Sequence, residues 1–151
     1  MATYNFPEAP APTILSNQSA LINRLLHNRS VTSEQDALDF LSPDYDTKLH
    51  DPALMHDMDK AVARVKVAME AKERIAIFSD YDCDGIPGAV VLHDFFKAVE
   101  YENFTNYIPH RHYEGFGLSV EAVDKLHKDE VKLIITIDCG TTDIEAVSHA
   151  K

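Results

Sequence analysis

Three short apolar runs that alternate with helix-like segments constrain the fold of this chain most strongly. The runs lie at residues 75–79, 104–108 and 132–137, and each is followed by a segment with helical spacing of apolar residues, at 88–100, 119–128 and 142–150. Strands that alternate with helices pair in parallel through right-handed crossovers. The sequence therefore predicts an α/β fold, with a parallel sheet built from Rossmann-like βα repeats. Because the segment 88–100 is apolar nearly all round, we expect it to be buried on more than one side.

A small helical region is predicted ahead of this sheet. Prolines at positions 7, 10 and 12 predict an extended tail over residues 1–18. Two short helices are expected over 19–28 and from Ser33 to Ser42, with these apolar residues facing inward: Leu21, Ile22, Leu25, Leu26, Ala37, Leu38 and Leu41. A longer amphipathic helix that packs on the sheet is indicated by Met55, Met58, Val62, Val65 and Met69. The predicted domains are the tail 1–18, a helical lead-in 19–72 and a sheet domain 73–151.

The composition indicates the class of protein, its expected location and the kind of partner that it can bind. The 151 residues are 45% hydrophobic and 26% charged, which is typical of a globular protein. No membrane-length apolar run, no signal peptide and only two cysteines are present, so we expect a cytoplasmic protein without a membrane partner. The net charge of −11 argues against a surface that coats nucleic acid. A polyanionic partner would have to be bound through cations and a few basic side chains.

Three aspartates follow the first predicted strand. Asp80, Asp82 and Asp84 are spaced by two, so their carboxylates can point the same way and repel unless a divalent cation lies between them. A calcium-binding EF-hand loop would need Glu at its twelfth position, where Val91 stands. An aspartyl-phosphate nucleophile with an acid/base two residues on is another interpretation, and a plain Asp-rich turn is a third. The spacing favours the metal site over the plain turn.

Two further turns are expected at the same edge, because ligands bind at the carboxyl ends of parallel strands. Asp138 follows the third run and would reach the same cation, although it could instead cap the next helix. The turn after the second run holds Arg111, which could bind phosphate or pair with Glu114. In the same turn His110 could touch phosphate or metal, and the glycines at 115 and 117 would let the backbone approach a ligand.

The three turns together resemble a known family. Asp80-Tyr81-Asp82-Cys83-Asp84-Gly85, the segment from Ile108 to Leu118, and Ile137-Asp138-Cys139-Gly140 are similar, in order and spacing, to the first three motifs of the RecJ-type single-strand-specific 5′ to 3′ exonucleases of the DHH phosphoesterase superfamily. The resemblance extends from about Leu21 to the last residue. It implies that residues 73–151 are the N-terminal part of a DHH phosphoesterase domain.

The resemblance implies a phosphodiesterase with two Mn²⁺ or Mg²⁺ ions that activate a water for attack on phosphorus. Asp82, Asp84 and Asp138 would be metal ligands and catalytic residues, with Asp80 as a further ligand or an orienting carboxylate. Substrate binding would fall to Arg111, His110, Gly115 and Gly117. Single-stranded DNA is the implied substrate, DNA repair and recombination the implied process, and a single-strand-binding protein an implied partner.

The Asp-His-His motif that names the superfamily is not in this sequence. We therefore expect an N-terminal fragment that needs the missing C-terminal half and has little activity of its own. One alternative is a DHH phosphoesterase acting on short oligonucleotides or cyclic dinucleotides. Another is a metal-binding or nucleic-acid-binding module without catalysis.

Overall fold

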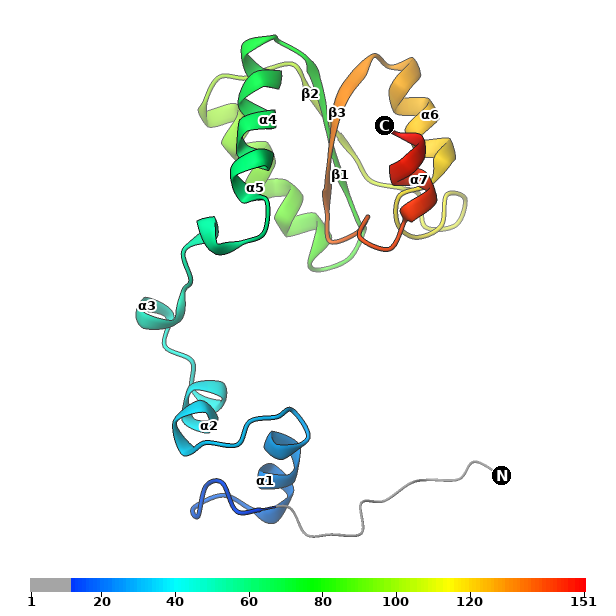
Figure 1. Ribbon diagram of the computed structural model, residues 1–151. Coiled ribbons are helices and arrows are strands. Elements are labelled where there is room, and N and C mark those ends of the chain that lie inside the picture. The colour runs from blue at the N-terminus through cyan, green and yellow to red at the C-terminus, as the bar shows by residue number, and fades with distance from the viewer. Residues whose placement is uncertain (1–11) are drawn as a thin grey trace, which may run out of the picture. The chain divides into compact units, whose positions relative to one another are not determined.

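The computed structural model describes residues 12–151 (Figure 1). By its internal contacts the chain divides into two compact units, Met1–Leu54 and Met55–Lys151. Residues 1–11, which make up most of the expected tail, lie outside the described residues. Among residues 12–151, no helix combines the length and the apolar character that crossing a membrane requires.

The first unit is helical, as expected. Its elements are α1 (Ala20–His27), α2 (Glu34–Leu41), α3 (Tyr45–Lys48) and a 3₁₀ turn η1 (Pro52–Leu54). Serine side chains cap the first two helices: the hydroxyl of Ser19 accepts the N–H of Ile22, and that of Ser33 accepts the N–H of Asp36. These caps confirm the two helix starts that the sequence indicated.

The core of the first unit is smaller than the sequence suggested. It consists of Leu15, Leu26 and Ala37, while four leucines expected to face inward are exposed: Leu21, Leu25, Leu38 and Leu41. Each of the two helices is only eight residues long, so it buries one stripe of side chains and leaves the flanking positions open. Residues 12–18 are also not an extended tail, because the buried amide oxygen of Asn23 accepts the N–H groups of Ile14 and Leu15, both at 2.8 Å.

The second unit holds the parallel sheet. Its elements are α4 (Met58–Glu70), β1 (Arg74–Ser79), α5 (Gly85–Ala98), β2 (Phe104–Tyr107), α6 (Val120–Lys128), β3 (Val131–Ile137) and α7 (Ile144–His149). The strand order is β2-β1-β3, and both pairings are parallel. This arrangement confirms the predicted α/β class.

Helices cover both faces of the sheet, α4 and α5 on one side and α6 and α7 on the other (Figure 1). Alternation along β1 serves the two layers: Ile75 and Ile77 pack in the core with Phe96 of α5, whereas Ala76 and Phe78 pack with Leu126 of α6. Helix α4 contributes Ala68 to the first of these cores. The structure thus groups α4 with the sheet, whereas the sequence-based boundary at residue 72 placed it in the lead-in.

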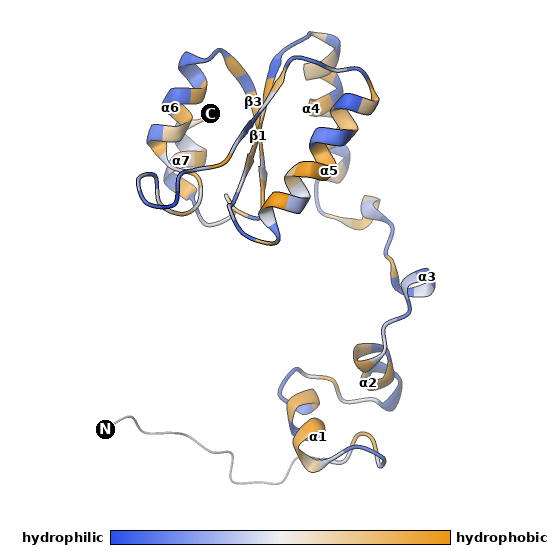
Figure 2. Cartoon of the chain, turned by 180° about the vertical axis from the view of Figure 1, so that it is seen from behind, coloured by the Kyte–Doolittle hydropathy of each residue, from blue (hydrophilic) through white to orange (hydrophobic). Residues whose placement is uncertain are grey.

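The surface of α5 differs from expectation. Figure 2 shows apolar residues along this helix, whose contacts within the second unit are chiefly with the strands of the sheet. Ala89 and Phe96 are buried, but Val90, Val91 and Phe95 are exposed. The expectation of burial on more than one side is therefore wrong for the described residues, because no element packs against the outer side of α5.

Candidate metal centre

The register of the sheet brings the first and third turns together. Ser79 at the end of β1 pairs with Ile137 at the end of β3, and the N–H of Asp80 donates to the carbonyl of Ile137 at 3.3 Å. The next residue of each strand is an aspartate, Asp80 on one side and Asp138 on the other. Asp138 has a φ of 57°, a left-handed conformation in which aspartate is tolerated better than most residues.

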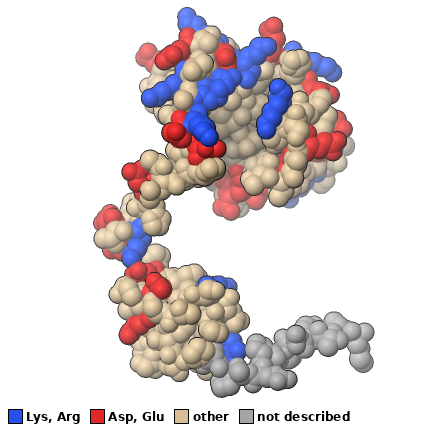
Figure 3. All heavy atoms as spheres, in the orientation of Figure 1, with Lys and Arg blue, Asp and Glu red and all other residues tan. Residues whose placement is uncertain are grey.

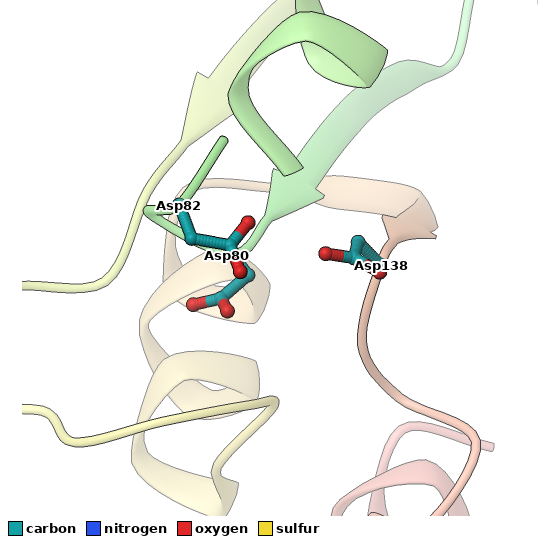
Figure 4. Close-up of side chains that lie close together, drawn as sticks. All are labelled: Asp80, Asp82 and Asp138. Carbon is teal, nitrogen blue, oxygen red and sulfur yellow. The ribbon is translucent and has the colours of Figure 1, made fainter. Parts of the chain in front are cut away.

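Three carboxylates converge at these strand ends. Asp80, Asp82 and Asp138 each offer one oxygen within 4.8 Å of the others, and Figure 4 shows them pointing toward one another from the ends of β1 and β3. Asp80 is buried, whereas Asp82 and Asp138 are exposed. Asp84, the fourth acidic residue expected at the metal, is exposed at the first position before α5 and lies outside this group of three.

Backbone amides hold the first turn in place. One carboxylate oxygen of Asp82 accepts the N–H groups of Asp84 and Gly85, both at 3.0 Å, and Asp80 accepts the N–H of Tyr81 at 2.7 Å. Helix α5 passes very close to β1 at this point, because a Cβ built on Gly85 would lie 2.5 Å from the carbonyl oxygen of Asp80. The turn therefore has little freedom to move its carboxylates apart.

The pKa values of two of these carboxyl groups are shifted in opposite directions. The amide hydrogen bonds from Gly85 and Asp84 lower the pKa of Asp82 below its ordinary value. The pKa of Asp138 is raised, first by loss of solvent around its carboxyl group and then by the negative charges of Asp82, Asp84 and Asp80. Acidic side chains also gather along the lower edge of this unit in Figure 3. A cation between these oxygens would relieve the repulsion, and a set of carboxylate donors suits Mn²⁺ or Mg²⁺.

The second turn places Arg111 beside the first. The guanidinium of Arg111 lies over the ring of Tyr81, 4.5 Å from its centroid, in a cation–π contact. Glu114 is engaged elsewhere, since its carboxylate accepts the N–H of His110 at 2.8 Å and the hydroxyl of Tyr107. The alternative of an ion pair between Arg111 and Glu114 is thus wrong for the described residues, in which Arg111 has no ion-pair partner.

The remaining residues of this turn have distinct surroundings. The ring of His110 packs on Tyr113 with centroids 4.5 Å apart, and both side chains are exposed. Gly115 has a φ of 82° and open space where a side chain would be. Gly117 is buried, and a Cβ built on it would lie 2.7 Å from a carboxylate oxygen of Asp143. The space beside Gly117 is therefore filled by protein.

Sequence reasoning missed Asp143 and Tyr81. Helix α7 begins at Ile144 with Asp143 in the N-cap position, so the alternative of Asp138 as its cap is wrong. An aspartate directly before a helix signals an N-cap, yet the Asp143 side chain makes no capping hydrogen bond. It accepts instead the N–H groups of Gly140 and Leu118, and the bond to Leu118, 25 residues away, is one that no local pattern could indicate.

The chain is similar in sequence to proteins of a known family. The family described as "DHH family, N-terminal domain" matches residues 74–151. The single-stranded-DNA-specific exonuclease RecJ of Bacillus subtilis is 36% identical over 132 residues, which cover 87% of this chain and 16% of that protein. The protein of the same name from Escherichia coli is 31% identical over 94 residues, 62% of this chain and 16% of its own length.

Solved structures show the same relationship. A crystal structure of exonuclease RecJ bound to manganese matches 62% of this chain and 24% of its own, with a TM-score of 0.56 and 31% identity. The fold is also shared with RecJ from Thermus thermophilus in complex with Mn²⁺, at a TM-score of 0.55 and 22% identity over 86% of this chain and 17% of that one. The chain spans about one sixth of the length of these two curated relatives. With more than half of its residues matched, the chain belongs to the DHH family and resembles the N-terminal part of the RecJ exonucleases.

Proposed function

We propose that this chain supplies part of the metal-binding and DNA-binding site of a phosphodiesterase that digests single-stranded DNA from its 5′ end. The observation that carries the proposal is the convergence of Asp80, Asp82 and Asp138, whose oxygens lie within 4.8 Å of one another. Relatives named as single-stranded-DNA-specific exonucleases and two manganese-bound RecJ structures support it. DNA repair and recombination are the processes in which such an activity would serve.

In this proposal Asp80, Asp82 and Asp138 hold Mn²⁺ or Mg²⁺. Asp84 is the fourth candidate ligand: it stands two residues beyond Asp82, and its charge contributes to the raised pKa of Asp138. Bound ions of this kind activate water and offset the charge of a phosphate under attack. The protein's own contribution is to fix the carboxylates, which it does through the amides that bond to Asp82 and the strand pairing beside Asp80.

The second turn would receive the DNA backbone. Arg111 is exposed, lies over the ring of Tyr81 and has no ion-pair partner among the described residues, so its donors can bind a phosphate. The open space at Gly115 would let the backbone approach the same phosphate. His110, the neighbour of Arg111 in the sequence, is the further candidate for contact with that phosphate. The ions and Arg111 together would let a chain of net charge −11 bind a polyanion.

We further propose that hydrolysis needs parts of the relatives that this chain does not span, since the Asp-His-His motif is absent from its sequence. The chain alone would then bind metal and DNA but hydrolyse little or none. A single-strand-binding protein as partner and a cytoplasmic location stay predictions.

Calorimetric titration with Mn²⁺ tests the metal site. Asp82→Ala and Asp138→Ala should each weaken binding at least about tenfold, because each removes one converging carboxylate. Asp94→Ala is the matched control, since Asp94 is exposed on α5 and makes no hydrogen bond or ion pair in the described structure. Unchanged Mn²⁺ affinity in both site variants would contradict the proposal.

Binding of a 5′-phosphorylated single-stranded oligonucleotide, followed by fluorescence anisotropy with Mn²⁺ present, tests the substrate. Arg111→Gln should reduce the affinity several-fold and lower the salt slope by about one. Lys66→Gln, an exposed lysine on α4, should change neither. Tighter binding of a cyclic dinucleotide than of the oligonucleotide would favour the alternative substrate class.

A further inference from the structure

We propose that Asp143 is a positioning residue that joins the two turns carrying Asp138 and Arg111. One oxygen of its carboxylate accepts the N–H of Leu118 at 2.7 Å and the N–H of Gly140 at 3.1 Å. Leu118 closes the turn after β2, and Gly140 lies two residues after Asp138 in the turn after β3. A single side chain thus fixes the backbone of both turns, and this inference rests on the proposed function of the site they form.

The surroundings of Asp143 are built for this contact. A Cβ on Gly117 would lie 2.7 Å and 3.1 Å from the two carboxylate oxygens of Asp143, and Gly117 has a φ of 76°, so only glycine fits without strain. Gly140 also has a positive φ, of 93°, and its Cβ would lie 2.8 Å from the hydroxyl of Thr136. Both turns therefore adopt conformations that let their amides face the same carboxylate.

The contact replaces the ordinary role of an aspartate at this position. Asp143 stands in the N-cap position of α7, where its side chain would normally bond to amides of the first helical turn. It makes no such bond and reaches back to Gly140, while the N–H of Asp143 donates to the carbonyl of Gly140 at 3.2 Å. The turn that carries Asp138 is therefore closed by two hydrogen bonds between the same pair of residues.

The hydrogen bonds of Asp143 would influence how tightly the site binds a metal ion. Side chains that orient metal ligands from behind typically change metal affinity by about 10- to 100-fold when they are removed. Asp143 does not belong to the converging carboxylates, so its effect on a cation would pass through the backbone on either side of it. The turn that carries Arg111 and the turn that carries Asp138 would then move together or not at all.

The test compares Asp143→Ala, Asp143→Asn and Glu145→Ala. Both Asp143 variants remove the charge, but Asn keeps one oxygen that can accept the two amides, as a single oxygen does in the structure. Glu145 is an exposed acid on the first turn of α7 without a hydrogen bond or ion pair in the described structure, which makes it the charge-matched control. The measurements are calorimetric titration with Mn²⁺ alone and hydrogen exchange of the Leu118 and Gly140 amides by NMR without metal.

We expect Asp143→Ala to lose protection of both amides and to weaken Mn²⁺ binding about tenfold or more. Asp143→Asn should stay within a few-fold of the unchanged chain, and Glu145→Ala should match it. Equal losses in the Ala and Asn variants with both amides still protected would overturn the proposal, because charge alone would then explain them. Should Asp143→Ala not fold, Gly117→Ala displaces the same carboxylate without removing it and must weaken Mn²⁺ binding likewise.

The outcome can be separated from the fate of the proposed function. If the unchanged chain does not bind Mn²⁺, the metal site is contradicted, yet the amide protection in Asp143→Ala still decides whether Asp143 joins the turns. If Mn²⁺ binds and depends on Asp82 and Asp138 but not on Asp143, the metal site stands and the positioning role fails.

Discussion

Asp80, Asp82 and Asp84 follow one another at a spacing of two, yet each has different surroundings. Asp80 is buried and continues the strand pairing, Asp82 accepts two amides of the following turn, and Asp84 precedes α5 without a side-chain cap bond. The alternation expected of an extended segment applies to the first pair only, because the backbone turns into a helix after Asp82. The group of converging oxygens therefore contains Asp138 in place of Asp84.

The opposite pKa shifts in this group have a definite consequence for stability. A carboxyl group whose pKa is raised in the folded state costs stability when it ionises, and this cost is complete above the folded pKa and absent below the unfolded pKa. Asp138 is such a group. Asp82, with a lowered pKa, contributes stability that is present above the unfolded carboxyl pKa and is lost as the pH falls through its folded value.

Without metal, Asp138→Asn should therefore raise Tm at neutral pH. Asparagine has the same shape and is well tolerated at the φ of 57°, so the substitution removes the repulsion without new strain. The gain should shrink as the pH falls below the raised pKa of Asp138 and vanish below the unfolded carboxyl pKa, because Asp138 of the unchanged chain is then neutral in both the folded and the unfolded state. Thermal melts between pH 3 and 7 would measure this, with Asp94→Asn as control; a gain that does not depend on pH would contradict it.

At the scale of elements, the approach of α5 to β1 decides the shape of the first turn. The helix begins at Gly85, three residues earlier than the periodic apolar pattern indicated. Asp82 supplies the reason, since its carboxylate accepts the amides of Asp84 and Gly85 and so starts the helix early. Pro87 falls in the first helical turn, where it lacks no necessary hydrogen bond.

Gly85→Ala should destabilise the fold by about 1–3 kcal/mol, because the new Cβ would lie 2.5 Å from the backbone carbonyl of Asp80. The helix must shift away from the strand, and the hydrogen bonds of Asp82 shift with it. Gly88→Ala is the comparison: its Cβ would lie 2.6 Å from the Cγ2 of Ile137, a branched side chain of β3, so it also costs stability. Its loss should be smaller than that of Gly85→Ala, because only a side chain must shift and alanine favours the helix by up to about 1 kcal/mol. Urea unfolding of the two variants tests this, and equal losses would count against a special role for Gly85.

The sequence predicted which elements form and at which edge of the sheet the acidic residues meet. Strand alternation and helix spacing are local patterns, and the parallel rule then places Asp80 and Asp138 at one edge. The features that the sequence could not predict depend on contacts between residues that are distant in the chain. The stacking of Arg111 on Tyr81, the diversion of Asp143 from its own helix and the bare outer side of α5 each depend on what lies opposite in space.

At the scale of the whole molecule, the repulsion from the net negative charge differs from the repulsion among the carboxylates of the candidate metal centre. The net charge of −11 is spread over the chain, and monovalent salt screens such repulsion beyond a Debye length of about 8 Å at physiological ionic strength. The carboxylates of the candidate metal centre lie within 4.8 Å of one another, closer than that length. Salt should therefore relieve the general repulsion and leave the local one in place.

A bound divalent cation acts on the local repulsion and should stabilise the whole fold. At about 100 times its Kd, Mn²⁺ should add about 2.7 kcal/mol to the free energy of unfolding and raise Tm accordingly, with reversal by a chelator. Sodium chloride should raise the Tm of the unchanged chain and of Asp138→Asn alike, because both keep the distributed charge. The Mn²⁺ effect should fall by about half or more in Asp138→Asn at the same Mn²⁺ concentration, since asparagine brings no charge to the cation and a site about tenfold weaker gains correspondingly less. If Mn²⁺ stabilised both proteins equally, the cation would bind elsewhere, and the strand ends of β1 and β3 would not be its site.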